Sequence, residues 1–190
     1  MYEIRIHGRG GQGAVLASKI LAKALADEGK YVKAIPSFGF ERRGAPVEAY
    51  LRFDDKEIRQ VTNIYYPDCI ICLDPTLQRS VDIFANIRED AVWVQTTKKS
   101  FIDLKVPKTV SMVGICDAFG IALRIFNKAI TNSIMLGAFS KTTGLVSMES
   151  LNKGMESVAF RDAALDKNIE AMQQGYQETR VLKVNNEDLS

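Results

Sequence analysis

The feature that most limits how this chain can fold is a cluster of four glycines between a strand pattern and a helix pattern. Residues 7–14 read HGRGGQGA. Residues 2–6 alternate apolar and charged side chains, as in a strand with one buried face, and residues 14–28 carry a helical apolar stripe that Gly29 can end. Glycine permits positive φ and lets an anion approach the N–H groups at a helix start. This order of a strand, a glycine loop and a helix therefore predicts an α/β fold with a candidate anion-binding site in the loop.

Further strand and helix patterns follow along the chain. Strands are expected at residues 31–35, 47–53, 68–74, 91–95 and 109–114, with a hairpin from 47–53 into 57–61. Helices are expected at residues 76–87 after Pro75, 133–143 capped by Asn132, from Ser147 and Glu149 onward, and at 163–180. The alternation predicts a three-layer α/β fold: a mainly parallel, Rossmann-like sheet flanked by helices, with a helical C-terminal third. We expect one domain over residues 1–180 and a loose tail over 181–190.

Composition narrows the class of protein. A chain of 190 residues with 46% hydrophobic and 25% charged residues is an ordinary globular domain. A net charge of +2 without a basic run gives no reason to expect nucleic acid, and no apolar run approaches the ~20 residues of a membrane span. With no signal-peptide pattern and only three cysteines, we expect a cytoplasmic protein.

The candidate binding residues of the glycine loop are Gly8, Arg9, Gly10, Gly11, Gln12 and Gly13, which have GxGxxG spacing. A dinucleotide fold also needs an acidic residue at the end of its second strand to bind the ribose. After residues 31–35 no carboxylate occurs before Glu41, so NAD is disfavoured. Two interpretations stay open: contact with another anion or cofactor, or a turn that only packs the helix onto the sheet.

The loop PSFGFERRGAP, residues 36–46, holds the second group of candidates. Arg42 and Arg43 can grip a phosphate or carboxylate in bidentate fashion. Phe38 and Phe40 can anchor in a partner's pocket, with Glu41 in the same interface. The alternative is a solvated loop with an internal Glu–Arg pair.

No complete catalytic set or metal site is apparent. Cys69 and Cys72 have CxxC spacing, but side chains three apart on a strand face opposite ways and cannot share a metal, which favours buried small hydrophobes. Cys116 has no cysteine nearby in the sequence. The only histidine, His7, is expected to form a hydrogen bond that shapes the loop.

Taken together and in this order, five motifs resemble the gamma subunit of 2-oxoacid:ferredoxin oxidoreductases, the pyruvate ferredoxin oxidoreductase domain III family. They are IRIHGRGGQGA, PSFGFERRGAPV, Leu73-Asp74-Pro75, NSIMLGA at residues 132–138, and Asn168 with Gly175-Tyr176. The resemblance runs to about residue 176. The form ERRGAPV looks more like pyruvate and branched-chain members than 2-oxoglutarate members, although oxalate and aryl-glyoxylate enzymes share the architecture.

The resemblance implies a non-catalytic subunit of an enzyme that converts a 2-oxoacid, pyruvate-like by this pattern, and coenzyme A into acyl-CoA, carbon dioxide and reduced ferredoxin. Thiamine diphosphate, Mg²⁺ and iron–sulfur clusters would lie in partner alpha, beta and delta subunits. This chain would contribute to assembly and to the coenzyme A side of the site. Two rivals stay open: a free-standing Rossmann-like nucleotide-binding regulator, and an enzyme that acts alone on a small anion.

Overall fold

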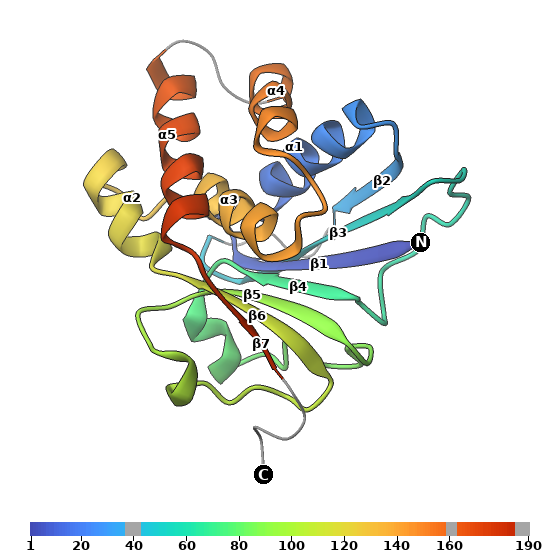
Figure 1. The fold of residues 1–190 in the computed structure, drawn as a ribbon, viewed down its shortest axis with the longest axis horizontal. Helices are drawn as coiled ribbons and strands as arrows, with labels where there is room; N and C mark the ends of the chain where they lie inside the picture. Colours follow the sequence, from blue (N-terminus) through green and yellow to red (C-terminus); the bar gives the residue numbers. More distant parts are fainter. Residues whose placement is uncertain (37–42, 159–162, 185–190) are drawn as a thin grey trace.

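A seven-stranded sheet forms the centre of the protein (Figure 1). The computed structural model describes residues 1–36, 43–158 and 163–184. In spatial order the strands run β2-β3-β1-β4-β5-β6-β7. Their bounds are β1 Tyr2–Arg9, β2 Tyr31–Pro36, β3 Pro46–Asp54, β4 Cys69–Cys72, β5 Ala91–Thr96, β6 Val110–Cys116 and β7 Arg180–Lys183.

The sheet is mainly parallel. β1, β4, β5 and β6 pair in parallel, while β3 is antiparallel to both β1 and β2, and β7 is antiparallel to β6. β2 therefore runs in the same direction as β1 with β3 inserted between them. The α/β fold class expected from the sequence is confirmed.

The two faces of the sheet are covered differently. All five α-helices of the described chain lie on one face: α1 Ala14–Asp27, α2 Ala118–Phe126, α3 Asn132–Thr143, α4 Met148–Val158 and α5 Ala163–Glu178 (Figure 1). The 3₁₀ helices η1 (Pro75–Arg79) and η2 (Phe101–Asp103) and long connections cover the other face. Side chains alternate accordingly: Cys69 and Ile71 belong to the core under the α-helices, whereas Ile70 and Cys72 belong to the core with Trp93.

Three expected elements are wrong. Residues 57–61 form no strand, and directly after them Arg52 of β3 donates to the carbonyls of Thr62 and Asn63, which fixes the chain there as a loop. Of the helix expected over 76–87, only the short 3₁₀ helix η1 forms. Beyond η1, Arg5 Nη2 donates to the backbone carbonyls of Ile83 and Ala85, at 2.9 Å each.

The third correction concerns the expected tail, whose first residues belong to β7, with Arg180 opposite Ile115 of β6. Asn132 is also not a cap but the first residue of α3. Thr131 is the N-cap, and its hydroxyl contacts the carbonyl of Leu73 at 3.3 Å instead of capping the helix.

Candidate functional site

The glycine loop lines an open pocket of about 660 Å³ at the carboxyl end of β1. We call it the glycine-loop pocket. Its polar lining is Arg9, Gly10, Gly11, Gly13, Lys19 and Arg43, and the first turn of α1 and Val47 complete it. Three of these side chains are cationic, and the part of the lining that the structure describes contains no acidic residue.

The start of α1 is open toward this pocket. Gly13 is the N-cap residue, with φ of +79°, and has no side chain to cap the helix, and the first turn contains no acidic residue. The first N–H groups of an α-helix have no carbonyl partner within the helix, and together they carry about half a positive charge. The pocket therefore offers both N–H donors and a positive potential to an anion.

Arg9 is largely occupied by the protein itself. Its guanidinium donates to Asp74 Oδ2 at 3.2 Å, to the carbonyl of Gly44 at 3.0 Å and to Thr76 Oγ1 at 3.0 Å. Because its charge is shared with a carboxylate, Arg9 mainly holds the wall of the pocket in place and contributes little free charge to a ligand.

Gln12 ties the loop to the same carboxylate. Its Oε1 accepts from the backbone N–H of Arg9 at 2.7 Å, and its Nε2 donates to Asp74 Oδ2 at 2.8 Å. Asp74 Oδ1 accepts from the N–H and hydroxyl of Thr76 at 2.8 and 2.6 Å. Burial alone would raise the pKa of Asp74, but the hydrogen bonds from Thr76 and Gln12 and the charge of Arg9 lower it on balance. Asp74 therefore stays ionised and fixes the shape of the loop.

The described end of the loop at residues 36–46, from Arg43 onward, lies beside the glycine loop. Because β3 starts next to the end of β1, the N–H of Gly10 donates to the carbonyl of Ala45 at 2.9 Å and the N–H of Gly44 donates to the carbonyl of Gly10 at 3.1 Å. This pairing brings the exposed Arg43 to the pocket.

The predicted site residues divide into three groups. Arg9, Gly10, Gly11, Gly13 and Arg43 come together at the pocket. Gly8 and Gln12 lie outside its lining: Gly8 is packed in β1 against Leu73 and Ala14. Phe38, Phe40, Glu41 and Arg42 lie outside the described residues, so their roles stay predictions.

Sequence reasoning missed Lys19 and the role of Asp74. Lys19 follows Val15 by four residues, so the helical repeat brings it to the pocket from the second turn of α1. Asp74 occurs in the Asp-Pro motif, but its position in the sequence does not indicate a contact with Gln12 or Arg9, which precede it by 62 and 65 residues.

His7 lies in the sheet and does not contact the loop through its side chain, so the expectation that it shapes the loop is wrong. Its Nε2 accepts from Arg5 Nε at 3.0 Å, and its Nδ1 is 3.5 Å from Glu48 Oε1. Burial, and secondarily the charge of Arg5, lower the pKa of His7 to about 3, so the contact with Glu48 involves a neutral imidazole and is not an ion pair.

The cysteines are buried free thiols. Burial raises the pKa of Cys72 to about 12 and that of Cys116 to about 11, and it also raises the pKa of Cys69. Among the described residues, no three His, Cys, Asp or Glu side chains gather closely enough to hold a metal ion. None of the helices described is both long and apolar enough to cross a membrane.

Residues 3–178 match the model of a protein family described as pyruvate ferredoxin/flavodoxin oxidoreductase. The chain is 58% identical over 181 residues to the NADH-dependent phenylglyoxylate dehydrogenase subunit gamma of Aromatoleum evansii, covering 95% of each chain. It is 46% identical over 186 residues to the pyruvate/ketoisovalerate oxidoreductases common subunit gamma of Thermococcus kodakarensis, covering 97% of this chain and 100% of the relative. The crystal structure of pyruvate oxidoreductase subunit PORC from Thermotoga maritima matches with a TM-score of 0.82 and 36% identity, covering 96% and 98% of the two chains.

Proposed function

The chain belongs to the pyruvate ferredoxin/flavodoxin oxidoreductase family as a gamma subunit, and from this premise we propose that its glycine-loop pocket binds the phosphates of coenzyme A. The observation that carries the proposal is the open start of α1 beside Lys19 and Arg43. Coenzyme A bears a diphosphate and a further phosphate, which are the groups that free helix N–H donors and unpaired cations hold.

The chain's own residues would bind and orient, not react. Asp74 and Gln12 hold the loop, and Arg43 and Lys19 supply charge. We propose that the chemistry lies in partner alpha, beta and delta subunits, which would carry thiamine diphosphate, Mg²⁺ and iron–sulfur clusters and pass electrons to ferredoxin. A cytoplasmic location and the absence of nucleic acid are further expectations.

The location of the clusters has a direct test. Purified alone, the chain should be colourless and inactive, because its three cysteines cannot supply the four thiolates of an ordinary cluster. Visible absorbance from stoichiometric iron in the purified chain would contradict this assignment.

The 2-oxoacid is a separate question. The form ERRGAPV favours a pyruvate-like acid, whereas the 58% identity to the phenylglyoxylate dehydrogenase subunit favours an aryl-substituted 2-oxoacid as the second candidate. One relative is named as a subunit common to pyruvate and ketoisovalerate oxidoreductases, which supports a gamma subunit that does not select the acid. Turnover of the native complex with pyruvate, 2-oxoisovalerate and phenylglyoxylate decides between the two.

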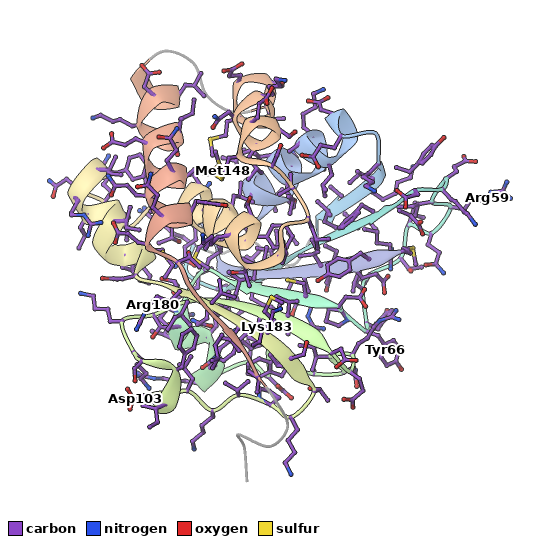
Figure 2. The ribbon with its side chains drawn as sticks, in the orientation of Figure 1. Arg59, Tyr66, Asp103, Met148, Arg180 and Lys183 are labelled. Atoms are coloured by element: carbon purple, nitrogen blue, oxygen red, sulfur yellow. The ribbon has the colours of Figure 1, made fainter. Side chains whose placement is uncertain are left out.

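The coenzyme A proposal is tested in the assembled enzyme with Arg43→Ala. Loss of a charge-assisted contact worth about 1.5–3 kcal/mol should raise the KM for coenzyme A about tenfold or more, with little change in the KM for the 2-oxoacid. Arg59→Ala is the matched control, because Arg59 is exposed in the segment that follows β3, at the opposite end of the sheet (Figure 2). An unchanged coenzyme A dependence would leave the loop with an architectural role only.

The regulator interpretation makes a different prediction. A free-standing regulator would purify from its host alone or as a homo-oligomer, whereas a gamma subunit purifies with larger partners. Family membership over residues 3–178 supports the second outcome.

A further inference from the structure

A second pocket, of about 500 Å³, lies at the carboxyl ends of β4, β5 and β6. We call it the carboxyl-end pocket. The residues that matter for its chemistry are Arg79, Gln95, Lys98, Lys99, Leu104 and Phe119. Open α/β sheets bind ligands outside the carboxyl ends of their parallel strands, so this is a favourable place for a site. The proposed function makes no use of it.

The pocket has an excess of positive charge. Arg79, Lys98 and Lys99 line it, against one carboxylate, Asp117. That carboxylate already caps α2 by accepting from the N–H of Gly120 at 3.0 Å, and it lies 3.8 Å from Lys98 Nζ. Neither Arg79 nor Lys99 has an acidic partner within 4 Å in the described part of the chain. Among the described residues, two cations of the pocket thus have no counter-charge within 4 Å.

The segment that carries the lysines is held in place. The N–H of Thr97 donates to the carbonyl of Cys116 at 2.8 Å, and Thr97 Oγ1 accepts from the N–H of Lys99 at 3.1 Å. From β7, Arg180 donates through Nη2 to the carbonyl of Lys99 at 3.2 Å, while its guanidinium lies over the ring of Phe101. These bonds fix the backbone, so a ligand would not have to order this turn.

An apolar wall and a polar floor complete the pocket. Leu104 and Phe119 are both half-buried and line it with apolar side chains. The floor is Gln95, which is 2% exposed; its Oε1 accepts from Trp93 Nε1 at 3.2 Å and from Gln78 Nε2 at 3.4 Å. Gln95 thus links the pocket to Trp93 in the core beneath it.

We propose that the carboxyl-end pocket binds a nucleotide. Its phosphates contact Arg79, Lys98 and Lys99, and its base lies against Phe119 and Leu104. Arg79 and Lys99 have no carboxylate within 4 Å in the described residues, and Lys98 shares only Asp117, so these groups favour phosphate, while an aromatic side chain offers a stacking surface for a base. The same adenosine diphosphate group can come from free ADP or from the ADP end of coenzyme A, so the two sources share one chemistry.

Trp93 gives this proposal an internal reporter. It is the only tryptophan of the chain, and it donates to Gln95 in the floor of the pocket. ADP titrated into the full-length chain should change Trp93 fluorescence saturably, with a dissociation constant below about 1 mM, and calorimetry should give the same constant. Inorganic phosphate and adenosine, each carrying half of the recognised chemistry, should bind at least about tenfold more weakly.

Substitution of the two lysines tests where the nucleotide binds. Lys98→Ala combined with Lys99→Ala should weaken ADP binding about tenfold or more, whereas Lys108→Ala, at an exposed position before β6, should leave it unchanged. Circular dichroism melting confirms that each variant is folded. ADP binding that the double variant does not weaken, or that inorganic phosphate matches, overturns the proposal.

Competition between coenzyme A and ADP distinguishes the two sources of the nucleotide. Coenzyme A that displaces ADP identifies its ADP end as the ligand of this pocket, which keeps the site but contradicts the assignment of the coenzyme A phosphates to the glycine-loop pocket. Coenzyme A that does not displace ADP identifies free nucleotide as the ligand and leaves both assignments standing. The inference does not depend on the glycine-loop pocket. Arg43→Ala tests that pocket through the KM for coenzyme A and should not change the ADP constant at Trp93, so the two proposals fail separately.

Discussion

Gly11 and Gly13 lie two residues apart and both have positive φ, yet their surroundings differ. A Cβ on Gly13 would lie 2.6 Å from Asn132 Nδ2, so this residue must be small for α1 to pack beside α3. A Cβ on Gly11, where φ is +91°, would meet nothing within 4 Å, because it would extend into open space beside the glycine-loop pocket. At the residue scale, therefore, Gly13 serves packing and Gly11 keeps the backbone accessible.

Gly11→Ala should raise the KM for coenzyme A severalfold in the assembled enzyme, because the methyl group stands where an anion would approach the N–H groups. Gly29→Ala is the matched control: Gly29 has φ of +84° and open space around it, but follows the other end of α1. Both changes carry the same backbone strain, about 1 kcal/mol. Steady-state kinetics should separate them, and equal KM values in the two variants would refute the role of Gly11.

His7 should make the stability of the chain depend on pH. Its folded pKa of about 3 is below the ordinary 6.5, so the neutral form is favoured in the native state and its stability contribution is complete above pH 6.5. As pH falls the unfolded state binds the proton first, and stability is lost toward the folded pKa. Between pH 7.5 and 5 the wild type should lose about 2 kcal/mol more than His7→Gln.

Urea unfolding of both proteins measures this difference. The chain contains no other histidine, so the comparison isolates one group. Parallel pH profiles for the two proteins would show that His7 takes up its proton in the folded state.

At the element scale, α3 and α5 pack with their backbones close together. A Cβ on Gly137 of α3 would lie 2.0 Å from the carbonyl oxygen of Met172, and one on Gly175 of α5 would lie 2.2 Å from that of Ile134. A buried hydrogen bond of 2.9 Å from Ser133 Oγ to Asn168 Oδ1 joins the same helices. Two of the family motifs are thus explained as the two sides of one helix–helix contact.

Gly137→Ala should therefore cost about 3 kcal/mol or more of unfolding free energy, because the clash is with backbone that cannot rotate away. Gly144→Ala, at the end of the same helix, has φ of +64° with open space and should cost only about 1 kcal/mol. Urea denaturation compares the two. A loss no larger for Gly137→Ala than for Gly144→Ala would mean that the helices move apart at little cost.

The elements that the sequence predicted well are those whose pattern is local. Alternation and apolar runs located β1 to β6, the apolar stripe and Gly29 located α1, and the helical pattern located α5. The errors come from contacts distant in the chain: Arg5 prevents a helix over 76–87, and β6 recruits residues 180–183 as an edge strand. The same holds for the candidate site. The glycine spacing is local and could be predicted, whereas the contacts of Asp74 with Arg9 and Gln12 depend on which strands are neighbours in the sheet and could not.

At the scale of the whole molecule, the two ends of the sheet differ in chemistry. Both pockets lie at the carboxyl ends of the parallel strands and are lined by cations. At the opposite end, Glu3 is buried between Arg52 and Arg88, at 2.5 and 2.9 Å, and Asp68 lies 3.4 Å from Arg88, so two carboxylates balance these two guanidiniums. The cationic linings of the two pockets at the carboxyl ends of the parallel strands would attract an anionic ligand or a partner's acidic surface.

Assembly should depend on this same end of the molecule. The aromatic pair Phe38 and Phe40 follows directly after β2, whose carboxyl end lies there, and interface anchors of this type commonly cost ~2 kcal/mol or more on truncation. Phe38→Ala combined with Phe40→Ala should therefore release the chain from its partner subunits in gel filtration at low concentration. The matched control is Tyr65→Ala with Tyr66→Ala, since these tyrosines are 63% and 60% exposed and Tyr66 lies far from the helices (Figure 2). A complex that survives the first pair and dissociates with the second would place the interface at the opposite end of the sheet.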